Sequence, residues 1–280
     1  MAFTEEGTSK FVQAGDVKVH YNEAGEGETL ILIHGGGPGA TGWSNYQRNI
    51  DALSKHFRCI LIDLPGYGKT DKVRPDTGLF AFFAKTIRDM LDELKIDKAH
   101  FIGNSLGGGT TLKFALDYPD RAGNLVLMGP GGSVPMFTPW PSEGIKHLFS
   151  YYEGDGPSMQ KLKNFIDVMV VDKTHLTDEL YEQRYQASID PEVVANPPLR
   201  IRKGMPLEEL WKENLGGLTH NVLLIWGRED RVIPLDMANL LLKTIPNAAL
   251  HVFPNCGHWA QWEKSEEFNP IVTNFIQGYK

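Results

Sequence analysis

Short runs of apolar residues alternate along this chain with longer stretches in which apolar residues recur every three or four positions. The runs lie at 29–33, 58–62, 99–102, 124–128, 222–226 and 250–253. Near-continuous apolar runs of this length are typical of strands that are buried on both faces of a sheet. The longer stretches, at 46–55, 79–95, 106–116, 235–244 and 263–277, have helical spacing. This alternation predicts an α/β fold, in which helices cover both faces of a mostly parallel sheet.

Two further strand-like patterns, at 10–12 and 17–21, precede the first of these runs and are separated by a turn at 14–16. Strands joined by so short a connection pair in the antiparallel direction. We therefore expect the sheet to begin with an antiparallel pair and to continue as a parallel sheet.

The region from 134 to 206 differs from the rest of the chain. It contains no strand-like apolar run, and its helical patterns at 144–151, 158–170 and 177–188 are separated by prolines. A segment of this length exceeds what an ordinary crossover between two strands uses. We therefore predict a helical lid (134–206) inserted into a core domain (1–133 and 207–280), over the functional edge of the sheet.

The run at 99–102 leads into Gly103-Asn104-Ser105-Leu106-Gly107, after which a helical pattern begins. A G-x-S-x-G sequence between a strand and a helix is typical of a serine held on a tight turn. Such a turn places the hydroxyl at the carboxyl edge of the sheet and at a helix N-terminus, where negative charge is stabilised. We predict that Ser105 is a nucleophile; the alternative is a glycine-rich turn with an incidental serine.

A serine hydroxyl needs a base, and the base needs a group that orients it. Two acids, Glu229 and Asp230, follow the strand at 222–226, and His258 follows the strand at 250–253. The order serine, acid, histidine is the one that enzymes with this serine turn use. We predict that His258 takes the Ser105 proton and that Asp230 orients the ring, with Glu229 as the competing acid.

Negative charge that forms on a substrate carbonyl oxygen needs two N–H donors fixed in place. The Leu106 main chain, directly after the predicted nucleophile, is one candidate. We expect the other in the sequence H-G-G-G-P-G at 34–39, which contains more glycine than a tight turn needs. Either Gly36 or Gly37 can turn its N–H inward, because neither carries a Cβ.

The composition argues against several classes of function. A formal charge of −7 and a pI near 5.7 disfavour nucleic acid or an anionic membrane as the main partner. No apolar run approaches the roughly 18 residues of a membrane helix, and 2 cysteines are too few for a disulfide framework. No zinc-site spacing and no nucleotide-binding motif is found in the sequence. We expect a metal-free, cofactor-free protein of the cytoplasm.

The motifs together resemble the α/β-hydrolase superfamily, and within it the meta-cleavage product hydrolases of bacterial aromatic and steroid ring degradation. The similarity runs almost end to end and is carried by H-G-G-G-P-G-A-T-G-W-S-N-Y, G-N-S-L-G-G-G-T, W-G-R-E-D-R-V-I-P-L-D and C-G-H-W-A-Q-W-E. The resemblance implies an eight-stranded α/β-hydrolase sheet and hydrolysis of a C–C bond in 2-hydroxy-6-oxohexa-2,4-dienoates after the dienol has ketonised. Such families usually pass through an acyl-serine, although a gem-diol route has been argued for some members.

By motif match, the resemblance further implies that Asn45, Asn104 and Arg184 hold the carboxylate and the 2-hydroxy/oxo end of the substrate, and that Trp259 lines the pocket. A guanidinium suits this role because it grips a carboxylate with two N–H bonds. The family also suggests a homo-oligomer, a dimer or larger. Leu106 replaces the methionine often found after the serine, and the lid matches less well than the core, so the preferred substituent stays open.

Two other functions use the same fold. A carboxylesterase would use the same three catalytic residues on an ester, and only the polar pair Asn104 and Arg184 favours the dienoate. A ligand-binding receptor would not need the complete set of catalytic residues that this sequence carries.

Overall fold

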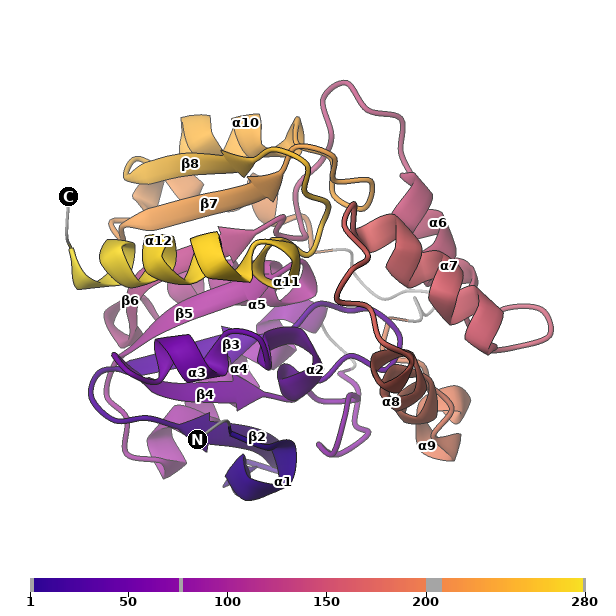
Figure 1. Cartoon of the computed structure of the whole chain (residues 1–280). Helices are drawn as coiled ribbons and strands as arrows, with labels where there is room; N and C mark the ends of the chain where they lie inside the picture. The colour runs from indigo at the N-terminus through magenta and orange to yellow at the C-terminus, as the bar shows by residue number, and fades with distance from the viewer. Residues whose placement is uncertain (1–2, 76–77, 200–207, 279–280) are drawn as a thin grey trace.

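The computed structural model describes residues 3–75, 78–199 and 208–278. Its strands form one eight-stranded sheet in the order β1-β2-β4-β3-β5-β6-β7-β8 (Figure 1). The strands are β1 (Ser9–Ala14), β2 (Val17–Ala24), β3 (Thr29–Ile33), β4 (Arg58–Ile62), β5 (Ala99–Asn104), β6 (Ala122–Met128), β7 (Val222–Gly227) and β8 (Ala248–Phe253). The predicted α/β sheet is confirmed.

The first strand pairs are antiparallel and the remainder are parallel. β1 runs antiparallel to β2, and β2 antiparallel to β4. Every pair from β4 through β8 is parallel. Because parallel strands end at the same edge, the loops after β3, β5, β7 and β8 meet there, where ligands bind in open α/β sheets.

Helices cover both faces of the sheet (Figure 1). One face carries α4 (Leu79–Glu93), α5 (Leu106–Asp117) and α10 (Met237–Thr244), and the other carries α2 (Gly42–Tyr46), α3 (Ile50–Leu53), α11 (Ala260–Glu263) and α12 (Ser265–Gln277). The remaining short elements of the core are α1 (Glu5–Thr8), η1 (Pro119–Arg121), η2 (Leu210–Lys212) and η3 (Leu215–Gly217).

One predicted helix differs from the structure. The stretch predicted at 46–55 contains the last residue of α2 and the short helix α3, which are separated by a turn at 47–49. Nδ2 of Asn49 in this turn donates to the main-chain oxygen of Gln261. Local periodicity did not reveal the break because this hydrogen-bond partner comes from the other end of the chain. The helix predicted at 263–277 is confirmed as α12, which begins at Ser265.

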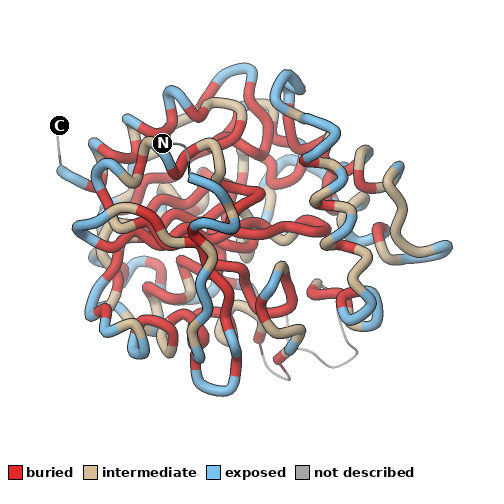
Figure 2. Tube along the Cα trace, turned by 60° about the horizontal axis from the view of Figure 1, so that its bottom comes forward, coloured by how far each residue is buried: buried red, intermediate tan, exposed pale blue. Residues whose placement is uncertain are grey.

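The sheet separates two hydrophobic cores. All five residues of β3 are buried, and its side chains alternate between the two sides. Ile31 and Ile33 enter the core under α4 and α5, whereas Leu30 and Leu32 enter the core under α3 and α12. Figure 2 shows the buried trace running through the centre of the molecule, with exposed segments at its rim.

The helices between β6 and β7 lie beyond the carboxyl ends of the parallel strands (Figure 1). They are α6 (Glu143–Ser150), α7 (Met159–Met169), α8 (Asp178–Ser188) and α9 (Pro191–Ala195). The described part of the segment from 134 to 199 contains no strand. The lid boundaries, 134–206 within a core of 1–133 and 207–280, stay a prediction, and positions 200–206 lie outside the described residues.

Candidate active site

Ser105 occupies a strained turn between β5 and α5. Its backbone has φ 53° and ψ −112°, a combination that non-glycine residues rarely adopt. Its N–H donates to the main-chain oxygen of Met128 at 2.8 Å. The flanking glycines allow a close approach, since a Cβ on Gly103 would lie 2.2 Å from the Gly107 oxygen and one on Gly107 2.2 Å from the Ile33 oxygen. The strained turn therefore holds the serine at the N-terminus of α5.

The loops after β7 and β8 bring Asp230 and His258 together. Nδ1 of His258 lies 2.7 Å from Oδ2 of Asp230, and both side chains are almost completely buried. The other carboxylate oxygen of Asp230 accepts the N–H groups of Val232 at 2.8 Å and Ile233 at 2.9 Å. Because a carboxylate only accepts hydrogen bonds, we assign the proton to Nδ1, which leaves Nε2 of His258 as the basic nitrogen.

Glu229, the competing acid, has other partners. Its carboxylate accepts the Cys256 N–H at 3.0 Å and forms an ion pair with Arg228. The bond from the Cys256 N–H lowers the pKa of Glu229. The structure therefore places Asp230, rather than Glu229, against the His258 ring.

The basic nitrogen of His258 lies free beside the serine turn. Nε2 is buried and has no hydrogen-bond partner within the described residues. The main chain of His258 is anchored to the turn, because Nδ2 of Asn104 donates to its oxygen at 3.2 Å. The ring packs over Gly129, where an added Cβ would lie 3.1 Å from Cε1, and Gly129 directly follows the residue to which Ser105 bonds. A general base requires such an unpaired nitrogen near the nucleophile.

The two candidate glycines for the second N–H donor have different surroundings. A Cβ added to Gly36 would lie 3.3 Å from Cδ2 of Leu106, the residue that follows the serine. A Cβ added to Gly37 would lie 2.8 Å from Nη2 of Arg184. Gly36 therefore lies beside the first predicted donor, whereas Gly37 lies beside the guanidinium.

The loop that carries these glycines begins with a buried, neutral histidine. Nδ1 of His34 lies 2.7 Å from the Gly35 oxygen, and Nε2 accepts the Leu64 N–H at 3.0 Å. Burial lowers the pKa of His34 to about 4. The ring therefore acts as a neutral bridge between the glycine-rich loop and the loop after β4.

Arg184 brings an unneutralised positive charge into the site. Its side chain is 1% exposed, and its Nε donates to the Pro38 oxygen at 2.8 Å. Burial lowers its pKa to about 10, so it remains charged at neutral pH. Nη1 has no hydrogen-bond partner, and no carboxylate forms an ion pair with Arg184, in the part of the chain that the structure describes. The buried guanidinium is therefore able to accept an anion.

The remaining predicted binding residues lie around this charge. The Arg184 guanidinium lies 5.3 Å from the Trp259 ring centre, and Nε1 of Trp259 donates to Oδ1 of Asn45 at 3.0 Å. Asn104, at the serine turn, has a buried Oδ1 without a partner within the described residues. The structure thus joins Asn45, Trp259 and Arg184 in one cluster, and it bonds Asn104, the residue before the nucleophile, to the main chain of His258.

A cavity of about 280 Å³ opens beside Ser105. It is bordered by the serine turn and the glycine-rich loop, through Ser105, Leu106 and Gly36. Most of its other described lining side chains are apolar and come from the core and the lid region: Leu79, Phe80, Trp140, Ile145, Leu148, Phe149, Ile233 and Met237. The cavity suits the hydrophobic part of a small ligand.

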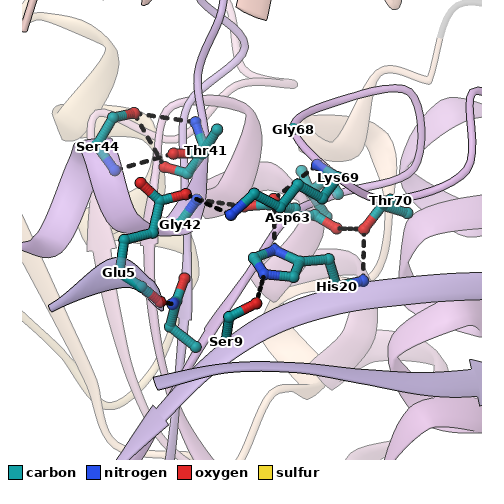
Figure 3. Close-up of polar contacts among 12 residues, drawn as sticks. Glu5, Ser9, His20, Thr41, Gly42, Ser44, Asp63, Gly68, Lys69 and Thr70 are labelled. Carbon is teal, nitrogen blue, oxygen red and sulfur yellow. Dashed lines mark hydrogen bonds and ion pairs between the residues drawn. The ribbon is translucent and has the colours of Figure 1, made fainter. Parts of the chain in front are cut away.

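A second Ser–His–Asp arrangement, which the sequence patterns did not indicate, is formed by residues of β1, β2 and the loop after β4. Nε2 of His20 lies 2.8 Å from Oγ of Ser9, and its Nδ1 lies 2.8 Å from Oδ2 of Asp63 (Figure 3). Asp63 also accepts the N–H groups of Gly42 at 2.8 Å and Lys69 at 3.0 Å. The carboxylate thus ties β2 and the loop after β4 to the start of α2. The available signal was the position of Asp63 directly after an apolar run.

Comparison with known proteins agrees with this architecture. The family model described as alpha/beta hydrolase fold matches residues 28–265. A 2-hydroxy-6-oxo-6-phenylhexa-2,4-dienoate hydrolase of Burkholderia cepacia is 45% identical over 284 residues, which cover 98% of each chain. A 2-hydroxy-6-oxononadienedioate/2-hydroxy-6-oxononatrienedioate hydrolase of Comamonas testosteroni is also 45% identical, over 97% of each chain.

The same similarity is seen in a solved structure. The meta-cleavage product hydrolase CumD of Pseudomonas fluorescens IP01, as a mutant complexed with acetates, superposes with a TM-score of 0.85 at 35% identity. The match covers 97% of this chain and 98% of that chain. The protein therefore belongs to the α/β-hydrolase family and, within it, to the meta-cleavage product hydrolases.

Proposed function

We propose that this protein hydrolyses the C–C bond beside the distal carbonyl of 2-hydroxy-6-oxohexa-2,4-dienoates, with Ser105, His258 and Asp230 as its catalytic triad. The observation that carries the proposal is the buried guanidinium of Arg184, whose Nη1 has no partner within the described residues. An unpaired buried charge is costly, and the substrate carboxylate supplies the missing partner. A simple ester has no such group, so this cation favours a dienoate over the substrate of a carboxylesterase.

The substrate lies with its polar end at Arg184 and its substituent in the apolar cavity. Asn45 and Trp259 support the guanidinium, since the Trp259 ring faces Arg184 while its N–H bonds to Asn45. Oδ1 of Asn104, which has no partner among the described residues, accepts a hydrogen bond from the 2-hydroxyl group of the dienol. This orientation places the distal carbonyl carbon at Ser105.

Cleavage begins when the dienol becomes a ketone, losing the 2-hydroxyl proton and gaining a proton at C5. Oγ of Ser105 then attacks the C6 carbonyl while Nε2 of His258 takes its proton, and Asp230 stabilises the imidazolium. The N–H groups of Leu106 and Gly36 hold the oxyanion. As the C5–C6 bond breaks, its electron pair moves through the conjugated chain to the 2-oxygen. The 2-oxygen takes the proton of the His258 imidazolium, and 2-hydroxypenta-2,4-dienoate is released.

Water completes the reaction. Nε2 of His258 takes a proton from water, which attacks the acyl-serine, and the proton returns to Oγ of Ser105 as the carboxylic acid leaves. In the gem-diol route the same base directs water at the C6 carbonyl without an acyl-serine, and the same two N–H groups hold the oxyanion. Trapping an acyl group on Ser105 by rapid quenching distinguishes the two routes.

The first test is optical, because these dienoates are yellow. The enzyme is mixed with the phenyl-substituted dienoate, and the loss of colour and the release of benzoate are followed, with Ser105→Ala as the control. We expect rapid bleaching by the wild type and about 10⁴- to 10⁶-fold slower turnover by Ser105→Ala. No bleaching, together with rapid hydrolysis of a nitrophenyl ester, would instead make the protein a carboxylesterase.

We also propose that the protein works in the cytoplasm as a homo-oligomer. Both cysteines, Cys59 and Cys256, are buried free thiols, which suits a reducing compartment. No helix among the described residues has the length and apolar character needed to cross a membrane. The exposed apolar residues Met136, Phe137 and Trp140, which precede α6, offer a surface for self-association. Light scattering during gel filtration measures the oligomeric state.

A further inference from the structure

The cavity beside Ser105 has one charged side chain among its described lining residues, that of Glu208. The other described lining residues offer no opposite charge to a ligand there. Most are apolar or glycine, and the large ones include residues of the first turn of α4, of α6 and the segment before it, and of the region after β7: Leu79, Phe80, Trp140, Ile145, Leu148, Phe149, Ile233 and Met237.

The Glu208 carboxylate is fixed in the cavity wall by the start of α4. Its Oε1 accepts the Ala81 N–H at 2.9 Å, and its Oε2 accepts the Phe80 N–H. A Cβ added to Gly78 would lie 2.2 Å from Cδ of Glu208, so the helix start packs directly on the carboxyl group. Burial raises the pKa of Glu208, whereas the two N–H donors favour its ionised form. The negative charge therefore has a defined position.

We propose that Glu208 restricts this enzyme to dienoates whose distal carbonyl carries an uncharged aryl or alkyl substituent, and that it rejects substituents that end in a carboxylate. The inference rests on the proposed function. Similarity alone does not choose between these classes, because the phenylhexadienoate and the nonadienedioate hydrolases are each 45% identical to this chain.

The two substituents differ in the free-energy cost of entering the cavity. A carboxylate-ended chain gives up its hydration on entering an apolar cavity and also meets the like charge of Glu208. A phenyl group carries neither cost and gains from burying its apolar surface. The N–H groups of Phe80 and Ala81 at the helix N-terminus are already bonded to Glu208, so they are not available to a substrate anion.

The first experiment uses the wild-type protein and three substrates: the phenyl-substituted dienoate, the nonadienedioate, and the primary amide of the nonadienedioate side chain. The amide has the size of the carboxylate without its charge. We expect kcat/KM for the phenyl substrate to exceed that for the carboxylate by about 100-fold or more. We expect the amide to be turned over about tenfold or more faster than the carboxylate.

The second experiment uses Glu208→Gln, which keeps the side-chain size and one oxygen acceptor for α4. We expect kcat/KM for the nonadienedioate to rise about tenfold while that for the phenyl substrate stays within about threefold. Glu209→Gln is the matched control, because its carboxylate is adjacent, partly exposed and paired with Lys212. In this control, kcat/KM for each of the three substrates should stay unchanged.

Equal turnover of the amide and the carboxylate by the wild type would overturn the proposal. So would an equal loss on all three substrates in Glu208→Gln, which would make Glu208 only a cap for α4. The wild-type comparison needs no variant, so it decides the matter even if Glu208→Gln does not fold. Failure to turn over any of the three dienoates would count against the proposed function itself.

Discussion

Arg184 of α8 donates through Nε to the main-chain oxygen of Pro38, 2.8 Å away, and so joins the helices between β6 and β7 to the glycine-rich loop. Nη1 has no partner among the described residues, and we propose that it binds the substrate carboxylate. We expect Arg184→Gln to lower kcat/KM for a dienoate by roughly 10²- to 10³-fold, because a buried carboxylate loses its charged partner. For nitrophenyl acetate, which has no carboxylate, kcat/KM should change less than about threefold. Equal losses on both substrates would show that Arg184 is structural.

The same residue predicts a conflict between stability and activity. Arg184→Met keeps the length of the side chain and removes a buried charge that has no counter-ion in the described residues. Replacing an unpaired buried charge with an apolar group is often neutral or stabilising. We therefore expect a variant that is inactive on dienoates and at least as stable as the wild type in urea. A loss of more than about 2 kcal/mol would mean that the native contacts already compensate the charge.

The backbone of Ser105 predicts measurable strain. Ser105→Ala and Ser105→Gly both remove the hydroxyl, but glycine alone adopts φ 53° and ψ −112° without a Cβ penalty. Glycine relieves about 1–3 kcal/mol of strain and costs about 0.5–1 kcal/mol through its extra freedom in the unfolded chain. We therefore expect the free energy of unfolding of Ser105→Gly to exceed that of Ser105→Ala by about 1 kcal/mol. Urea unfolding of the two variants measures this difference. Equal stability would indicate an unstrained turn.

The two neighbouring acids after β7 should respond very differently to loss of charge. Asp230→Asn removes the acceptor that holds the Nδ1 proton of His258, 2.7 Å away, and should lower kcat by about 10⁴-fold. Glu229→Gln is the matched control, since Glu229 bonds to the Cys256 N–H and to Arg228 instead. Turnover of the phenyl dienoate should remain within about threefold in the control. A reversed result would assign the acid to Glu229.

His34 predicts a loss of stability in mild acid. Its folded-state pKa of about 4 lies below the ordinary histidine value of 6.5. Between these pH values His34 is protonated in the unfolded chain but not in the folded chain. The free energy of unfolding therefore falls as the pH drops from 6.5 to 4, and His34 causes no further fall below pH 4. The loss at pH 4.5 is about 2–3 kcal/mol. His34→Gln should therefore lose less stability than the wild type between pH 7 and 4.5, as measured by urea unfolding at each pH. Parallel losses would contradict a buried neutral ring.

The Ser9–His20–Asp63 arrangement should not be catalytic. Ser9 lies within strand β1 rather than on a strained turn, and unlike Ser105 it is not among the described residues that line the cavity. We expect Ser9→Ala to keep kcat within about twofold, because the bond that it removes, to His20, involves none of Ser105, His258 and Asp230. A fluorophosphonate should label the wild type and Ser9→Ala, but not Ser105→Ala. Label recovered on a peptide that contains Ser9 would show a second reactive serine.

The sequence by itself determined the strands, the serine turn and the order of the chemistry-bearing loops. The apolar runs at 29–33 and 58–62 coincide with β3 and β4 at both ends, because strands buried on both faces need an unbroken local run. The turn at Ser105 was readable because its steric requirement, glycine two residues before and after, is also local. His258 was recognisable because it follows a buried strand late in the chain.

Only the tertiary structure decided the features that depend on side chains distant in sequence. It placed Asp230 rather than Glu229 against the imidazole, and Gly36 rather than Gly37 beside Leu106. It also buried Arg184 without a carboxylate partner in the described residues. Local periodicity records which side of an element is apolar, whereas the choice between neighbouring residues depends on loop geometry. The sequence does not show whether a charged side chain is buried or paired, because both depend on neighbours that are distant along the chain. Only the packed structure shows which groups surround a charge such as that of Arg184.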